Sequence, residues 1–162
     1  MNDKYKYDIG NLEKVAEMKV ACDYSFSRLY EGSSYNPNWM AQRDFDDAKY
    51  YLSRKEDNVM EIKHRLEDIC HDDNEINVEK ARSLMETLDK LRVECGKYQM
   101  QLDLFRIIMK KHPELELEDR TVGDVLRLRT KRREEAQARR QADNKSGKDV
   151  AKLRKEIEEA VK

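Results

Sequence analysis

The chain of 162 residues contains few of the residues that interrupt helices, with five glycines and two prolines. This scarcity argues against a β-rich, turn-rich fold and against a flexible low-complexity chain. No apolar run approaches the roughly 20 residues that span a bilayer. Residues 1–7 lack the basic-then-apolar layout of a secretory signal. We therefore predict no membrane contact and an intracellular, cytoplasmic location, meaning the host cytoplasm or the virion if the protein is viral.

Cysteine is also scarce. The three cysteines, Cys22, Cys70 and Cys95, are odd in number and include no C-x-x-C pair. That argues against a disulfide scaffold and against a thiolate zinc site. Each cysteine falls within a helical pattern, so we expect three reduced, partly buried thiols. Charge, by contrast, is abundant, since Asp, Glu, Lys and Arg make up 41% of the chain. With so few helix breakers, this composition is typical of long helices and coiled coils.

Two segments repeat apolar residues at alternating spacings of four and three. A repeat that averages 3.5 residues keeps one stripe of a helix facing a partner helix, so both segments are predicted to be coiled-coil helices. The first stripe consists of Ala41, Phe45, Ala48, Leu52, Lys55, Val59, Ile62, Leu66 and Ile69. The second stripe consists of Ala81, Leu84, Leu88, Leu91, Cys95, Tyr98, Leu102, Phe105 and Met109.

The connection between the two stripes, residues 70–75, is short, polar and rich in capping residue types. Such a connection favours antiparallel neighbours. We therefore predict an all-α fold built on an elongated antiparallel helical hairpin. Folding about this connection pairs Ile62 with Leu88, Leu52 with Tyr98, and Phe45 with Phe105.

Lys55 interrupts the first apolar stripe at the position opposite Cys95. A charge at a seam position commonly sets register or oligomeric state, at some cost in stability. Alternatively, the lysine lays its stem along the seam and keeps its ammonium in water. Long paired helices with a charged seam are readily completed by a second copy, so we expect a homo-oligomer.

A further helix is predicted before the hairpin, over residues 11–30, with Gly32 ending it. Pro37 is preset to begin the next helix. Tyrosines and Trp39 gather in the first 39 residues. These aromatic side chains can stack on the bases of single-stranded nucleic acid or serve as a hot spot for binding a protein. Packing at a corner of the helical bundle is the simpler interpretation. The face of this first helix that covers the hairpin is predicted to consist of Leu12, Val15, Cys22, Phe26 and Leu29.

Four segments are predicted along the chain. Residues 1–112 form the helical core, which ends at His112 because proline disfavours α conformation in the residue before it. Residues 113–126 form an acidic connector and the start of a helix capped by Thr121. Residues 127–148 form a basic helical extension, and we expect residues 144–148 (Asn-Lys-Ser-Gly-Lys) to break it. Residues 149–162 form an amphipathic helix capped by Asp149, whose partner-docking face is Val150, Leu153, Ile157 and Val161.

The net charge of −1 conceals a marked asymmetry, since residues 1–126 carry a net −7 and residues 127–148 a net +6. Positive charges gathered on a helix without an apolar stripe repel one another, and this repulsion costs stability unless an anionic partner neutralises them. Nucleic-acid phosphate, an acidic protein surface and plain solvation are the alternatives. Residues 127–148 show no arginine–aromatic alternation, so any nucleic-acid contact there would be backbone-directed and weakly sequence-specific. The basic residues are Arg127, Arg129, Lys131, Arg132, Arg133, Arg139, Arg140, Lys145 and Lys148.

The sequence contains few candidate catalytic or metal-binding residues. His64, Asp68 and His71 share one helical face, and such a set can hold a divalent metal. However, both histidines fall outside the apolar seam, with no partners to orient them. The chain also lacks a Gly-rich phosphate loop, a G-x-S-x-G motif and an H-E-x-x-H motif. We therefore predict no metal, no cofactor, no catalytic residue and no enzymatic activity.

These patterns favour a non-enzymatic helical adaptor or assembly protein that binds protein partners through its coiled-coil surfaces and C-terminal helices. The alternative is a nucleic-acid accessory factor that applies residues 127–148 to the phosphate backbone. The layout is similar, in architecture only, to small oligomeric accessory proteins of tailed phages, which join a helical hairpin core to nucleic-acid-facing ends. That similarity assigns no residues.

Overall fold

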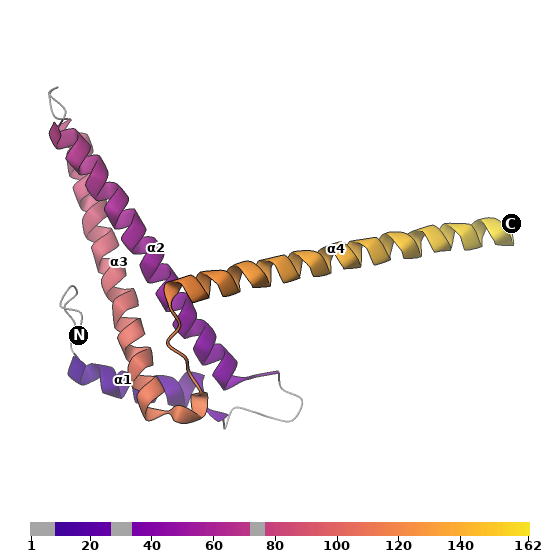
Figure 1. The fold of residues 1–162 in the computed structure, drawn as a ribbon, viewed down its shortest axis with the longest axis horizontal. Coiled ribbons are helices and arrows are strands. Elements are labelled where there is room, and N and C mark those ends of the chain that lie inside the picture. The colour runs from indigo at the N-terminus through magenta and orange to yellow at the C-terminus, as the bar shows by residue number, and fades with distance from the viewer. Residues whose placement is uncertain (1–8, 27–33, 72–76) are drawn as a thin grey trace. The chain divides into compact units, whose positions relative to one another are not determined.

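The computed structural model describes residues 9–26, 34–71 and 77–162, and all regular structure among them is helical (Figure 1). The α-helices are α1 (Ile9–Asp23), α2 (Pro37–His71), α3 (Val78–Lys111) and α4 (Val122–Val161), with a short 3₁₀ helix, η2 (Pro113–Leu115), after α3. The predicted all-α fold is confirmed. The chain divides into two compact units, Met1–Val122 and Gly123–Lys162.

Helices α2 and α3 form the predicted antiparallel hairpin (Figure 1). Every residue of the two predicted stripes is buried or half-buried, as a heptad seam requires. The expected pairing of Phe45 with Phe105 is found, because their rings stack with centroids 5.3 Å apart. Burial is deepest at this end of the hairpin, where α1 also contacts α3. The seam residues near the other end, such as Ile62 and Leu84, are only half-buried.

The helix ends follow local chemistry that is visible in the sequence. Pro37 is the first residue of α2, and the Asn36 side chain accepts a hydrogen bond from the Trp39 amide at 3.0 Å. The side chain of Asn77 caps α3 by accepting from the Lys80 amide, also at 3.0 Å. Helix α3 ends at Lys111, directly before His112 and Pro113, as predicted. Of the predicted connection, residues 72–75 lie outside the described part of the chain.

The prediction for the first helix is wrong in its end and, except for Leu12, in its buried face. Helix α1 stops at Asp23, whose carbonyl accepts a hydrogen bond from the Tyr35 hydroxyl. Its buried residues are Leu12 and Ala16, followed by Tyr24 just beyond the helix, whereas Val15 and Phe26 are 46% exposed. The shift follows from Tyr24, which packs on Phe105 and donates from its hydroxyl to the Asp44 carboxylate at 2.5 Å. Leu29 and Gly32 lie outside the described residues.

The cysteine prediction holds only in part. All three cysteines are free thiols. Cys95 is fully buried in the hairpin seam, but Cys22 and Cys70 are exposed rather than partly buried. Cys22 is exposed because α1 buries the side of the helix that carries Leu12 and Ala16, and among the described residues of the predicted face only Leu12 lies there.

Helix α4 runs without interruption from Val122 to Val161 (Figure 1), so the expected break at residues 144–148 is wrong. A glycine in a helix interior costs only about 1 kcal/mol relative to alanine, and the segment contains no proline. The good helix formers on both sides outweigh that cost, and Asp149 consequently lies inside the helix instead of capping a new one. None of the described helices combines the length and the apolar character that a bilayer crossing requires.

Gly147→Ala is expected to stabilise α4, because a Cβ at this position would meet no atom within 4 Å. A gain of about 1 kcal/mol would slow amide hydrogen exchange of the surrounding helical turn about fivefold. Mass-spectrometric hydrogen exchange on the full chain measures this change. The matched control is Ala151→Gly one turn later, which should speed exchange by a similar factor. Unchanged or faster exchange in the Gly147→Ala variant would contradict a continuous helix.

Candidate partner-binding helix

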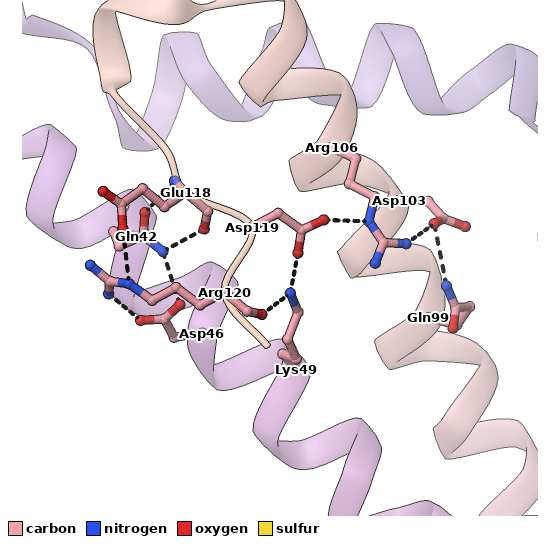
Figure 2. Close-up of polar contacts among 9 residues, drawn as sticks. All are labelled: Gln42, Asp46, Lys49, Gln99, Asp103, Arg106, Glu118, Asp119 and Arg120. Carbon is pink, nitrogen blue, oxygen red and sulfur yellow. Dashed lines mark hydrogen bonds and ion pairs between the residues drawn. The ribbon is translucent and has the colours of Figure 1, made fainter. Parts of the chain in front are cut away.

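The residues that lead into α4 return along the hairpin after a tight turn. Glu116 adopts left-handed backbone angles (φ 52°, ψ 40°), and its amide donates to the Pro113 carbonyl at 3.0 Å. Leu115, beside it, is 1% exposed and belongs to the hydrophobic core. This turn directs residues 118–120 between α2 and α3, where their polar groups meet side chains of both helices (Figure 2).

Asp119 joins this segment to both helices of the hairpin (Figure 2). Its carboxylate accepts from Lys49 of α2 and, at 3.2 Å, from Nε of Arg106 of α3. Lys49 is only 8% exposed and donates also to the carbonyl of Arg120. Burial alone would raise the pKa of Asp119, but the hydrogen bonds from Lys49 and Arg106 outweigh it and lower that pKa below its ordinary value of 3.8. The ionised form is therefore the one that the fold stabilises.

A second group of contacts holds the neighbouring residues against α2. The side-chain amide of Gln42 both donates to the Glu118 carbonyl at 2.9 Å and accepts from the Glu118 amide at 2.7 Å. It thus pairs with the backbone as a neighbouring strand would. Arg120 forms an ion pair with Asp46 at 2.8 Å, and Asp46 is itself 7% exposed. Three successive residues are therefore fixed by three side chains from consecutive turns of α2.

An open hollow of about 630 Å³ lies beside this network and is lined by Lys49, Gln99, Asp103 and Arg106 among others. Asp103 accepts from Gln99 and from Arg106, each at 3.2 Å. Lys49, Asp103 and Arg106 of the hollow are thus paired with oppositely charged side chains. Their geometry serves the attachment of residues 118–120.

His112 connects the end of α3 to α1. Its ring nitrogens lie 3.2 Å from a Glu17 carboxylate oxygen and 2.9 Å from one of Glu114. Burial disfavours the charged ring, but the hydrogen bonds to Glu114 and Glu17 prevail and raise the pKa of His112 above 6.5. The hydrogen bond of Glu114 with its own backbone amide, followed by that with His112, lowers the pKa of Glu114.

The predicted basic residues all lie on α4, within one continuous helix. All are exposed except Arg129, which is half-buried, and Arg127 pairs with Asp124 at 2.5 Å. Because successive helical residues are separated by about 100°, neighbours such as Lys131, Arg132 and Arg133 point to different sides. The segment therefore offers positive charge around the helix instead of on one face.

The predicted docking residues form one apolar stripe on the last turns of α4. Spacings of three, four and four residues place them on a single side of the helix. Hereafter "the apolar stripe" means Val150, Leu153, Ile157 and Val161, which are 57%, 56%, 55% and 81% exposed. A row of exposed apolar side chains along one side of a helix marks an interaction surface, so the stripe is the clearest candidate for a partner contact.

Lys55 forms an ion pair with Glu94 of α3, with Nζ 2.6 Å from the carboxylate oxygen. This hydrogen bond with Glu94 raises the pKa of Lys55. The lysine side chain is 30% exposed, so the ammonium reaches the edge of the seam while remaining paired across it. The contact links α2 to α3 beside the buried Cys95. The suggested role of Lys55 in setting register or oligomeric state stays a prediction.

The remaining candidates are not assembled into a site. His64 lies 3.4 Å from Glu67, and both side chains are about two-thirds exposed. Over residues 9–26, 34–71 and 77–162, no three His, Cys, Asp or Glu side chains lie close enough together to hold a metal ion. Of the early aromatics, Tyr24 is buried in the core, and Trp39 is 52% exposed beneath Arg43. Tyr5, Tyr7 and Tyr30 lie outside the described residues.

Comparison with known protein families, curated proteins and solved structures found no match for this chain.

Asp119→Asn is expected to lower the free energy of unfolding at pH 7 by about 1–3 kcal/mol, because it leaves the buried Lys49 ammonium without a charged partner. The pKa of Asp119 is lowered in the fold, so its contribution is complete above pH 3.8 and is lost as the pH falls through the lower, folded value. The free energies of unfolding of the wild type and the variant should therefore converge at low pH. Urea unfolding of both proteins from pH 7 to pH 2.5 measures this.

The control for this experiment is Asp89→Asn, whose carboxylate is 77% exposed and 3.9 Å from Arg92. It should change stability by less than about 0.5 kcal/mol at any pH. An Asp119→Asn variant as stable as the wild type at pH 7 would show that residues 118–120 are not held by this pair.

Proposed function

We propose that the protein is a non-enzymatic helical adaptor or assembly protein, which binds a protein partner through the apolar stripe of α4 and associates with itself. The observation that supports this proposal most is the exposure of the stripe, 55–81% at four large apolar residues on one side of a helix. An amphipathic helix with anchors at these spacings is the kind of segment that fits a hydrophobic groove or another helix.

The rest of the chain is consistent with a binding role. In the hollow beside residues 118–120, Arg106 pairs with Asp103 and Asp119, so these groups hold the structure together. The long, packed helices of the hairpin form a rigid scaffold, and a rigid scaffold suits a protein that presents a binding surface.

Leu153→Asp combined with Ile157→Asp should reduce partner capture at least tenfold, because two carboxylates would have to be desolvated in the contact. Affinity capture with the full chain as bait, followed by quantitative mass spectrometry, measures this loss. The control is Lys155→Asp, which changes the net charge by the same two units on the opposite side of the helix. If the Leu153→Asp, Ile157→Asp variant retains the same partners, the stripe is not their binding surface.

The second candidate function is nucleic-acid binding through residues 127–148. It is supported by their net charge of +6 on a continuous helix that is almost entirely exposed. Lys and Arg side chains that contact phosphate release condensed counterions, so binding of this kind weakens steeply with salt.

Replacing Arg132, Arg133, Arg139 and Arg140 by Ser should weaken binding to labelled DNA and RNA of any sequence at least tenfold. Removing one phosphate contact should also reduce the slope of log affinity against log salt by about one. Fluorescence anisotropy at two salt concentrations measures both effects. The control removes four exposed cations of the hairpin instead: Lys63, Lys80, Arg82 and Lys90. An affinity that does not change with salt, or an equal loss in the control, would contradict this candidate function.

A further inference from the structure

Three of the four residues of the apolar stripe follow the pattern of one strand of a dimeric coiled coil. Counted in heptads, Val150 and Ile157 occupy successive a positions, and Leu153 occupies the d position between them. All three are more than half exposed. β-branched residues at a with leucine at d favour two parallel strands over higher oligomers. The pattern therefore points to a second α4 as the occupant of this face.

The charges that flank the stripe complement one another across such a dimer. Asp149 lies at a g position and Arg154 at the following e position, five residues later. In a parallel, in-register pair, each g residue faces the next e residue of the partner. Asp149 of each chain would thus lie opposite the partner's Arg154, which gives two symmetric ion pairs.

The opposite orientation is disfavoured by the same residues. An antiparallel pair that keeps Val150 opposite Leu153 places g positions of the two chains side by side. These g positions are Asp149 and Glu156, both acidic. Like charges would then meet at both ends of the contact, which disfavours this arrangement.

The seam also defines where the contact must end. Continued toward the N-terminus of α4, the a and d positions become Asp143, Arg139, Ala136 and Arg132. Arginines at two successive d positions would repel their counterparts, so pairing stops near Ser146. The contact comprises about 16 residues, or roughly 24 Å of helix, so dimer formation should depend on concentration.

We propose that residues 146–161 of α4 form a parallel, in-register two-stranded coiled coil with a second copy of this chain. The proposal rests on the proposed function, because it names the partner of the apolar stripe.

The test begins with the full chain carrying Cys22→Ser and Cys70→Ser, which leaves only the fully buried Cys95. Adding Ser146→Cys at a d position should give a covalent dimer on mild oxidation, because equal positions meet in a parallel pair. Lys155→Cys, at an f position on the outer side, should not cross-link. If Ser146→Cys remains monomeric while a chain with both Ser146→Cys and Ile157→Cys cross-links, the pair is antiparallel and the proposal is overturned.

A second measurement tests the ion pairs by sedimentation equilibrium of otherwise wild-type chains. The average mass should rise from 19.3 kDa toward twice that value as the concentration increases. Asp149→Arg alone and Arg154→Asp alone should each raise the dissociation constant about tenfold, and the two together should restore it. Equal weakening in the double variant would overturn the proposed pairing.

The dimer and the adaptor function fail differently. A chain that stays at 19.3 kDa at every concentration overturns the dimer. If the Leu153→Asp, Ile157→Asp variant of such a monomer still loses its protein partners, the adaptor function stands and the stripe binds a different protein.

Discussion

An ammonium group that is nearly closed off from water must find oxygen partners, and Lys49 of α2 is in this position. It is 8% exposed, with its nitrogen 5.0 Å from the centre of the Phe45 ring. Burying an unpaired charge is far more costly than the stability of a typical domain allows. Both acceptors come from residues 119 and 120, some 70 positions later. The chain returns from α3 to α2 at the place where this cation finds its oxygen partners, and Gln42 and Asp46 hold residues 118 and 120 beside it.

The hairpin could be predicted because its information is local and periodic. Each stripe repeats every 3.5 residues over about four heptads, and a pattern of that length fixes both the helix and the face that it buries. The polar network at residues 118–120 could not be predicted, since its partners are distant in sequence and of common types. A signal was nevertheless present. Asp46 and Lys49 each follow directly after a heptad residue of α2, Phe45 and Ala48. A buried face slightly wider than the heptad positions would therefore bury them as well.

The two errors in the predicted helices have opposite causes. In α1, apolar periodicity suggested a long helix, but the tertiary contacts of Tyr24 with Asp44 and Phe105 end it earlier and turn a different face inward. In α4, local turn chemistry around Gly147 suggested a break, but nothing in the tertiary structure calls for one. Helix propensity then determines the local structure. A single glycine flanked by good helix formers is not enough to end the helix.

In the proposed parallel dimer, the two candidate functions of α4 would be coupled through its seam. In a parallel dimer, Arg132 and Arg139 of both chains would occupy facing d positions, where they limit the length of the coiled coil by mutual repulsion. A phosphate held between the two helices would relieve that repulsion. Anything that binds better to the dimer than to the monomer must favour dimer formation by the same free energy. Because residues 1–126 carry a net −7, a polyanion would be repelled from the remainder of the chain and directed to this segment. Self-association and anion binding would therefore strengthen each other, although the apolar contact alone comprises only about two heptads.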